Sequence, residues 1–207
     1  MTTLLAPDVR SDAQVHLGWP APGAFAAGSV VTAGVFDGFH RGHEALVARA
    51  VGHGERLGLP TVLVTFSPHP LAVLAPGAAP RQLMSLNDRV RHAFSLGVDS
   101  VVVVPFTASV AHQSAADFVA SGLVDALGIR LLVVGENFRC GRGGLGDLDR
   151  LQELGRTHGF GLDAVDLVAA AGERCSSTEV RRLLARGDID GARHLLGRDD
   201  HRVLVVQ

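Results

Sequence analysis

Short apolar runs alternate with amphipathic stretches along most of this chain of 207 residues. Five runs are mostly apolar and rich in β-branched residues, which is typical of strands buried on both faces: 30–33, 60–66, 101–104, 131–134 and 162–168. Six stretches show helical periodicity, at about 43–57, 85–96, 114–127, 148–158, 178–186 and 189–196. The alternation predicts an α/β protein with a Rossmann-like, doubly wound, five-stranded parallel sheet and helices on both of its faces.

The pattern divides the chain into one main domain and two short ends. Residues 1–28 contain Ala, Pro and Gly without a clear period, apart from a short strand pattern at 13–17, and we expect them to form an N-terminal arm over the domain. Residues 29–198 hold the alternating pattern and form the domain, and residues 199–207 are a C-terminal tail. A chain of this length buries about 70% of its unfolded surface, which is enough for a full core.

Charge and composition exclude several classes of partner. A net charge of −2 and a pI near 6.5 give no basic field that would attract nucleic acid or a membrane surface. No apolar run approaches the roughly 20 residues of a membrane span, and the first residues do not resemble a signal peptide. The two cysteines, Cys140 and Cys175, are too few for a disulfide framework, so we expect a cytoplasmic protein. The oligomeric state stays open, with a homo-oligomer among the alternatives.

Three unusual loops, 34–43, 67–70 and 135–146, follow predicted strands. The carboxyl ends of parallel strands meet at one edge of a sheet, and ligands bind there. The first loop carries three glycines and leads into a helix, so its backbone N–H groups and the helix dipole favour a phosphate. His40 and His43 stand at i and i+3, on one face of that helix start. The sequence contains no lysine, which excludes a Walker-type loop, and the glycine spacing is not that of a dinucleotide-binding loop.

Two of these patterns also have plainer interpretations. Two histidines at i and i+3 could ligate zinc, although no nearby His, Cys or Asp is spaced to supply a third ligand. Ser176-Ser-Thr-Glu179 has the spacing of a capping box at a helix start. Its hydroxyls, with Arg181 one turn into the helix, would equally suit an anion. The two interpretations of this segment are compatible with each other.

Four motifs, in order along the chain, resemble those of one family. Gly34-Val-Phe-Asp-Gly-Phe-His-Arg-Gly-His43 is similar to the G-x-F-D-G-x-H-x-G-H motif of bacterial FAD synthetases, in the adenylyltransferase module that belongs to the HxGH nucleotidylyltransferase superfamily. Three later stretches resemble further family motifs, and a Leu-Gly-Arg closes the series: Thr65-Phe-Ser-Pro-His-Pro70, Gly135-Glu-Asn-Phe-Arg-Cys-Gly141, Cys175-Ser-Ser-Thr-Glu-Val-Arg181 and Leu196-Gly-Arg198. The resemblance covers nearly the whole chain.

The resemblance implies FMN adenylyltransferase activity, in which AMP passes from ATP to FMN, giving FAD and pyrophosphate, with Mg²⁺ accompanying ATP. It implies catalytic roles for His40, His43 and Arg181, which would stabilise charge on the reacting phosphates. At the matching positions, the residues expected to bind ATP are Gly34, Phe36, Asp37, Gly38, His40, His43, Ser176, Ser177, Thr178 and Arg181. Those expected to bind FMN are Phe66, Pro68, Asn137 and Cys140. Residues that would hold the metal are not identified.

Two positions depart from the family pattern and leave other functions open. Cys140 stands where the family usually has a second aromatic residue, and Ser67 stands where it often has an acid. Both favour, as an alternative, a nucleotidylyltransferase that acts on a modified flavin or on another phosphorylated acceptor. A further alternative is a non-catalytic regulator that binds nucleotide or flavin, and the presence of His40, His43 and Arg181 argues against it.

The end of the sequence also differs from the family pattern. Bifunctional members continue past the Leu-Gly-Arg motif into a riboflavin kinase module, whereas this sequence ends nine residues after Arg198. We therefore expect no riboflavin kinase module, and we expect FMN to come from another source.

Overall fold

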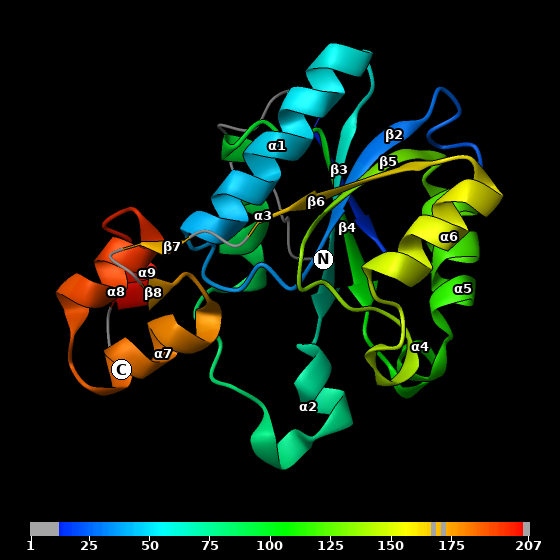
Figure 1. Cartoon of the computed structure of the whole chain (residues 1–207). Helices are drawn as coiled ribbons and strands as arrows, with labels where there is room; N and C mark the ends of the chain where they lie inside the picture. Colours follow the sequence, from blue (N-terminus) through cyan, green and yellow to red (C-terminus); the bar gives the residue numbers. More distant parts are fainter. Residues whose placement is uncertain (1–12, 167–168, 171–172, 205–207) are drawn as a thin grey trace.

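The computed structural model describes residues 13–166, 169–170 and 173–204. At its centre is a six-stranded sheet in which all neighbouring strands are parallel, in the order β1-β4-β3-β2-β5-β6 (Figure 1). The strands are β1 (Gln14–Leu17), β2 (Ser29–Ala33), β3 (Thr61–Ser67), β4 (Ser100–Pro105), β5 (Ile129–Gly135) and β6 (Gly161–Val165). The α/β class and the parallel, doubly wound sheet predicted from the sequence are confirmed.

The number of strands differs from the prediction, because the sheet has six strands where the sequence predicts five. The additional strand is β1, which pairs with β4 at one edge of the sheet. β1 has only four residues and none of them is buried, so it lacks the apolar run that marks the central strands. At the other edge β6 ends at Val165, and residues 167–168 of the fifth predicted strand lie outside the described residues.

Helices cover both faces of the sheet (Figure 1). One face is covered by α1 (Arg41–Leu57) and α3 (Leu86–Ser95), and the other by α6 (Leu148–His158) and by α5 (Ala115–Asp117) with its π-helical continuation Phe118–Ala126. The remaining elements are short: α2 (Pro70–Leu74), the 3-10 turns Pro76–Ala78 and Arg142–Gly144, α4 (Ala108–His112), the hairpin of β7 (Ala169–Ala170) and β8 (Glu173–Arg174), α7 (Ser177–Ala185), α8 (Ile189–Leu196) and α9 (His201–Leu204).

The central strands send alternate side chains into two separate hydrophobic cores. In β2, Val30 belongs to the core under α1 and α3, and Val31 belongs to the core under α6. Both side chains are fully buried. Since burial on both faces disfavours polar residues, the central strands are mostly apolar runs, and this is why the sequence predicts them well.

Local signals place the helix ends where the sequence predicts them. Ser85 caps α3 by accepting a hydrogen bond from the N–H of Asp88, and Ser114 and Asp117 form a reciprocal capping box at the start of α5. α1 ends at Gly58, whose φ of 64° is the left-handed conformation that glycine favours after a helix. The helix starts at Ser85 and Ser114 mark where connections from the carboxyl edge of the sheet end, and Gly58 begins the connection to the amino end of β3.

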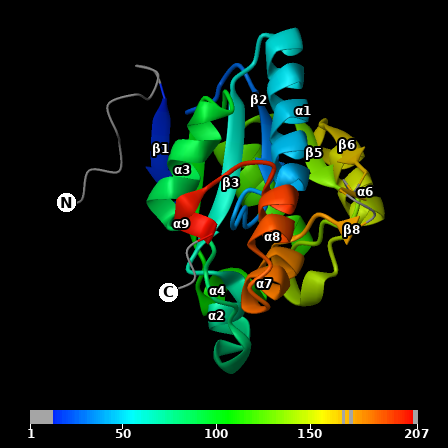
Figure 2. The same cartoon turned by 90° about the vertical axis from the view of Figure 1, so that its left-hand side faces the viewer.

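The strand order reverses at β2. From β2 the chain continues to β3 and β4 on one side, and β5 and β6 follow on the other side. The loops after β2 and β5 leave the sheet next to each other, at the position where parallel α/β sheets bind their ligands. The C-terminal helices α7 and α8 lie at this same edge, beside the amino end of α1 (Figure 2).

Candidate functional site

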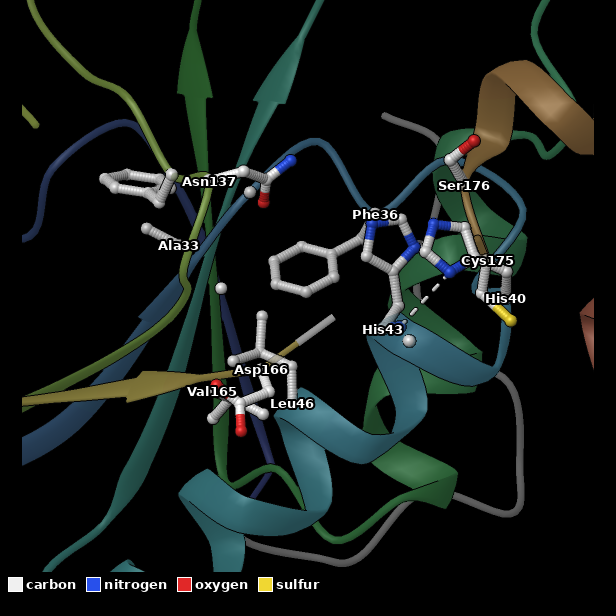
Figure 3. Close-up of a pocket in the computed structure, with 14 residues that line it drawn as sticks. Ala33, Phe36, His40, His43, Leu46, Asn137, Val165, Asp166, Cys175 and Ser176 are labelled. Atoms are coloured by element: carbon white, nitrogen blue, oxygen red, sulfur yellow. Dashed lines mark hydrogen bonds between the residues drawn. The ribbon is translucent and has the colours of Figure 1, made fainter. Parts of the chain in front are cut away.

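Three adjoining cavities lie at the carboxyl ends of the strands. The central cavity, of about 180 Å³, lies between the loop after β2, the start of α1 and the ends of β5 and β6 (Figure 3). The arginine cavity, of about 360 Å³, is lined by Asp37, His69, Ser177, Thr178 and Arg181, among others. The aromatic cavity, of about 520 Å³, includes Phe66, Phe106, Phe118 and Phe138 in its walls.

Shared residues join the three cavities into one site. His40 and His43 line both the central and the arginine cavity. Gly34 and Asn137 line both the central and the aromatic cavity. The structure thus brings together residues from all four sequence motifs, and the two histidines stand where a ligand would pass from one cavity to the next.

The loop after β2 is held in an uncommon backbone conformation. Phe36 and Phe39 have positive φ angles of 53° and 43°, which side-chain-bearing residues rarely adopt. Their rings are fully buried and stack on each other, with centroids 5.4 Å apart. Phe36, predicted to bind ATP, therefore lies beneath the central cavity with no exposed surface, and the two rings anchor the loop in the core.

Arg198 fixes the same loop from outside the core. Its guanidinium donates hydrogen bonds to the backbone oxygens of Gly38 and Phe39, at 2.8 Å and 2.5 Å, and to a carboxylate oxygen of Glu44 at 3.1 Å. Gly38, another predicted ATP-binding residue, has a φ of 81° and is not among the residues that line the three cavities. The structure gives Gly38 the role of a turn residue in this loop.

Two glycines of the loop leave space for the rings beside them. A Cβ on Gly34 would lie 3.2 Å from the ring of Phe36, and a Cβ on Gly42 would lie 3.1 Å from Nδ1 of His40. The second contact would push on the imidazole at the centre of the site. An alanine in place of this glycine would therefore crowd the His40 ring and require it to shift by a few tenths of an ångström.

His40 is the N-cap of α1, and this fixes its hydrogen-bonding role. Its Nδ1 accepts a hydrogen bond from the backbone N–H of His43 at 3.3 Å. Burial lowers the pKa of His40 from 6.5 to about 4, with Glu44 opposing the shift and Arg198 adding to it. The ring is therefore neutral near pH 7, and because Nδ1 is an acceptor the proton is on Nε2. His40 presents one N–H donor to the site.

His43 stacks on His40, with ring centroids 3.7 Å apart. Burial, followed by the nearby His40, Arg89 and Arg198, lowers the pKa of His43 well below its usual value. Its Nδ1 is buried without a hydrogen-bond partner among the described residues. A buried polar atom of this kind is costly unless a ligand meets it, which supports a functional role for the ring.

The low pKa of His40 predicts a pH-dependent stability. In the unfolded chain the ring has a pKa near 6.5, so between about pH 6.5 and pH 4 the unfolded chain binds a proton that the folded chain does not bind. The contribution is fully present above pH 6.5 and is lost as the pH falls toward 4, by up to about 3 kcal/mol in the free energy of unfolding. Urea unfolding across this range should show a smaller loss for His40→Asn, which keeps a capping acceptor but does not titrate. An equal loss in both proteins would contradict the neutral, buried state of His40.

Asp37, which is buried, and Arg181, which is partly exposed, form an ion pair at the wall of the arginine cavity. Arg181 donates to the Asp37 carboxylate at 2.5 Å and to the backbone oxygen of Arg81 at 2.7 Å. The same carboxylate accepts hydrogen bonds from the backbone N–H groups of Leu83 and Met84. Asp37 is almost fully buried, so its carboxylate, predicted to bind ATP, is held by protein donors and in turn holds Arg181 in place.

The start of α7 agrees with both interpretations of residues 176–179. Ser176 caps the helix by accepting a hydrogen bond from the N–H of Glu179 at 3.2 Å. Ser177 donates its hydroxyl to the backbone oxygen of Asp37, and Ser177 and Thr178 line the arginine cavity. The helix N-terminus therefore faces the cavity, although binding of a phosphate there stays a prediction.

The aromatic cavity contains three of the four residues predicted to bind FMN. Phe66, Asn137 and Cys140 line it. Pro68 is exposed and is not in its wall, whereas Pro70, at the start of α2, is. Burial raises the pKa of the Cys140 thiol to about 11, so this side chain is a neutral, weakly polar part of the wall.

Sequence reasoning missed two residues of the site. His69 lines the arginine cavity, caps α2 by accepting from the N–H of Leu71 at 3.1 Å, and has a pKa lowered by burial and then by Arg181. Like His40, it therefore presents a neutral Nε2–H. Its signal in the sequence is its place in the Pro-His-Pro turn. Arg198 stands in the sequence only as part of the Leu-Gly-Arg motif, and nothing local in the sequence connects it to the loop that it fixes.

The carboxylates of the site do not form a protein metal centre. The described residues contain no group of three or more His, Cys, Asp and Glu side chains arranged to hold a metal ion. The nearest acid in the arginine cavity, Asp37, already accepts hydrogen bonds from two backbone N–H groups and from Arg181. The donor set therefore does not fit an ion held mainly by protein ligands.

Fold and site together define a class of protein: a doubly wound, parallel α/β protein whose switch point carries adjoining cavities, one lined by Arg181 and one by aromatic side chains. The family model for FAD synthetase matches residues 24–179, so the chain belongs to the FAD synthetase family. No helix in the described ranges is long and apolar enough to span a bilayer.

Individual relatives agree with this family. A bifunctional riboflavin kinase/FMN adenylyltransferase from Pseudomonas fluorescens is 43% identical over 171 residues, which cover 83% of this chain and 55% of the relative. The protein of the same description from Escherichia coli (strain K12) is 38% identical over 170 residues, covering 82% of this chain and 54% of the relative. This chain thus spans about half the length of the curated relatives it matches.

A solved structure supports the fold. The crystal structure of a macrolide-efflux protein from Streptococcus pneumoniae superposes with a TM-score of 0.72, covering 92% of this chain and 57% of that chain. The two sequences are 23% identical, so the likeness supports the architecture and nothing about activity.

Proposed function

We propose that this chain is an FMN adenylyltransferase, which transfers AMP from ATP to FMN and releases pyrophosphate. The observation that supports this best is that the cationic arginine cavity and the aromatic cavity both adjoin the central cavity, with His40 and His43 at the boundary between the central and the arginine cavity. A polyphosphate suits the first and a flat apolar ring suits the second. Membership of the FAD synthetase family, and the names of the two relatives, point to the same reaction.

The three cavities suggest how the substrates lie. The nucleoside of ATP would occupy the central cavity, and its β- and γ-phosphates the arginine cavity beside Arg181, Ser177 and Thr178. The flavin ring would lie in the aromatic cavity against Phe66, with Asn137 at its edge. The α-phosphate of ATP would then lie where the central and arginine cavities meet, next to His40 and His43.

The reaction is an in-line displacement at phosphorus. An oxygen of the FMN phosphate attacks the α-phosphorus of ATP, and a new P–O bond forms. The bond from the α-phosphorus to the oxygen that bridges to the β-phosphorus breaks, and pyrophosphate leaves with that electron pair. Because the attacking phosphate is ionised at neutral pH, no general base is needed, and the rate depends on positioning and on stabilisation of charge.

The side chains of this chain supply donors for that charge. His40 offers a neutral Nε2–H on the α-phosphate side, and His69 offers another in the arginine cavity. Arg181, held by Asp37, supplies a cation for the leaving pyrophosphate. His40 would remain a neutral donor throughout the neutral pH range, because an imidazole with a pKa near 4 does not change its protonation state there.

In this proposal Mg²⁺ reaches the site bound to ATP. Mg²⁺ binds the oxygens of ATP and keeps several of its waters, so it requires few protein ligands. Since the described carboxylates of the site do not form a metal centre, we derive no step through a protein-bound ion.

Incubation of the pure protein with ATP, Mg²⁺ and FMN tests the proposal directly. The expected result is FAD and an equal amount of pyrophosphate, separated by HPLC and measured with a coupled phosphate assay. Absence of FAD, with pyrophosphate released from ATP when another phosphorylated acceptor is supplied, would contradict FMN as the acceptor and retain the transferase class. Nucleotide binding without turnover of any acceptor would instead support a regulator.

Asn137 provides a test of the acceptor site. Asn137→Ala should raise the KM for FMN about 10-fold, because a buried ring edge loses its hydrogen-bond partner at a cost of about 1–2 kcal/mol. The KM for ATP should change less, and Gln152→Ala on the exposed face of α6 serves as a matched control. Steady-state kinetics with each substrate varied in turn would show this. A rise confined to the KM for ATP would move Asn137 to the nucleotide.

A modified flavin is the second candidate acceptor, and Cys140 favours it. The thiol lies in the wall of the aromatic cavity, and an aromatic side chain at position 140 would leave less space for the acceptor than the cysteine does. Comparison of FMN with ring-substituted FMN analogues in the same assay distinguishes the two acceptors by their kcat/KM values.

The cytoplasm remains the proposed location of the protein. Cys140 and Cys175 are both free thiols, which agrees with a reducing compartment. Association into a homo-oligomer stays open, and light scattering of the purified protein would determine it.

A further inference from the structure

A buried arginine outside the predicted site lies directly behind the arginine cavity. Arg89 lies in the first turns of α3 and is 2% exposed. Among the fully buried side chains of the described residues it has the largest volume. Among the described residues no carboxylate lies within ion-pair distance of it, the charge of Asp37 favours it only from farther away, and its Nε has no hydrogen-bond partner. A buried, unpaired cation is costly, and so is a cation near the positive end of a helix dipole. Three unfavourable features at one residue suggest a functional reason.

The hydrogen bonds of Arg89 connect two loops of the site. Its guanidinium donates to the hydroxyl of Thr65 at 3.1 Å and to the backbone oxygen of Phe66 at 3.2 Å, at the end of β3. The Thr65 hydroxyl in turn donates to the backbone oxygen of Val35 at 3.0 Å. Val35 lines the arginine cavity, and the loop after β3 contributes His69 to the same wall. Arg89 thus holds the loops after β2 and β3 together.

The charge of Arg89 also acts on the cavity. It helps to lower the pKa of His43. The pKa of His69 is lowered mainly by burial and then by Arg181, Asp37 opposes the shift, and Arg89 adds a smaller lowering effect. Both histidines line the arginine cavity. In the described part of the chain Asp37 is the one carboxylate that acts on both Arg181 and Arg89, and the low pKa values of the histidines keep them uncharged near pH 7. Arg89 therefore leaves a positive charge behind the place proposed for a polyphosphate.

We propose that Arg89 is a positioning residue for the polyphosphate: a buried cation behind the wall of the arginine cavity that favours the bound phosphates and keeps the two loops in register. This rests on the proposed function in so far as the arginine cavity takes phosphates. Water is excluded around Arg89, so its charge is screened less than a surface charge would be. A fixed charge of this kind needs no rearrangement when the phosphates bind or react.

Variants at three positions separate charge from shape. Arg89→Met removes the charge and fills a similar volume, and Arg89→Lys keeps the charge without the guanidinium fork. Thr65→Val removes the hydroxyl that links the two loops. Arg91→Met removes an exposed cation from the same helix and is the matched control. If Arg89→Met does not fold, Arg89→Gln, which is neutral and polar, takes its place.

The first measurement is binding of inorganic tripolyphosphate by calorimetry at two salt concentrations. Arg89→Met should weaken binding about 10-fold or more and reduce the salt dependence, while Arg89→Lys and Arg91→Met stay within about 3-fold of the wild type. The rate of FAD formation should change in the same order, with kcat/KM for ATP about 100-fold lower in Arg89→Met and close to the wild-type value in Arg89→Lys. Wild-type binding of tripolyphosphate by Arg89→Met would overturn the proposal.

The second measurement is the titration of the site histidines by NMR. Removal of a nearby cation should raise the pKa of His43 and His69 in Arg89→Met and leave them nearly unchanged in Arg89→Lys. A purely structural residue would instead show equal losses in both Arg89 variants and in Thr65→Val, with no ordered change in the histidine titrations, and this would overturn the proposal. Tripolyphosphate binding that depends on Arg89 in a protein that makes no FAD would count against the proposed reaction alone.

Discussion

Replacing His40 by asparagine should lower kcat for FAD formation by about 100- to 1000-fold, because one preorganised donor to the reacting phosphate is lost. The helix cap should survive, since asparagine can accept the same hydrogen bond from the N–H of His43 that Nδ1 of His40 accepts. The KM values should change less than kcat, because the donor matters most when charge builds on the α-phosphate. Single-turnover kinetics with the variant and the wild type would measure the chemical step itself.

The structure supplies a control for this experiment. His112 is the last residue of the short helix α4. It is exposed and outside the three cavities, so His112→Asn should retain wild-type rates. Thermal unfolding at pH 8, where His40 is uncharged in both folded and unfolded states, should give similar midpoints for His40→Asn and the wild type. A near-normal rate for His40→Asn would refute its role as a donor.

The central part of the fold could be predicted from the sequence because it depends on local patterns. Strands buried on both faces are mostly apolar runs, and serine and glycine mark the helix ends. Parallel topology then places the loops after β2, β3 and β5 at one edge, which brings the motifs together. β1 could not be counted with the same assurance, because it is short, unburied, and paired with a strand more than eighty positions later in the chain.

The parts of the site that the sequence could not predict depend on distant contacts. Arg181 pairs with Asp37 across 144 positions, and Arg198 holds Phe39 across 159 positions. The neutral state of His40 is set by burial, which no local pattern reveals. Phe36 has the sequence position of a ligand contact, yet the φ angles of the loop turn its ring into the core. In each case tertiary packing decides the role of a residue whose type was visible in the sequence.

Replacing Arg181 by methionine should have the largest combined effect on stability and activity. The Asp37 carboxylate would then be buried without its cation, which costs about 3–5 kcal/mol in the free energy of unfolding. Loss of the proposed pyrophosphate contact should lower kcat/KM about 100-fold or more in addition. Urea unfolding and FAD formation measured on the same preparation would give both numbers.

The double variant Asp37→Asn/Arg181→Met separates the two effects. The neutral amide can still accept hydrogen bonds from the N–H groups of Leu83 and Met84, so much of the stability should return. Activity should not return, since the cation at the cavity wall is still missing. Arg182→Met, which breaks a partly exposed pair with Glu179, should cost less than about 1 kcal/mol and leave turnover intact. Recovery of activity together with stability in the double variant would show that Arg181 acts only through the fold, and it would remove Arg181 from the proposed catalytic set.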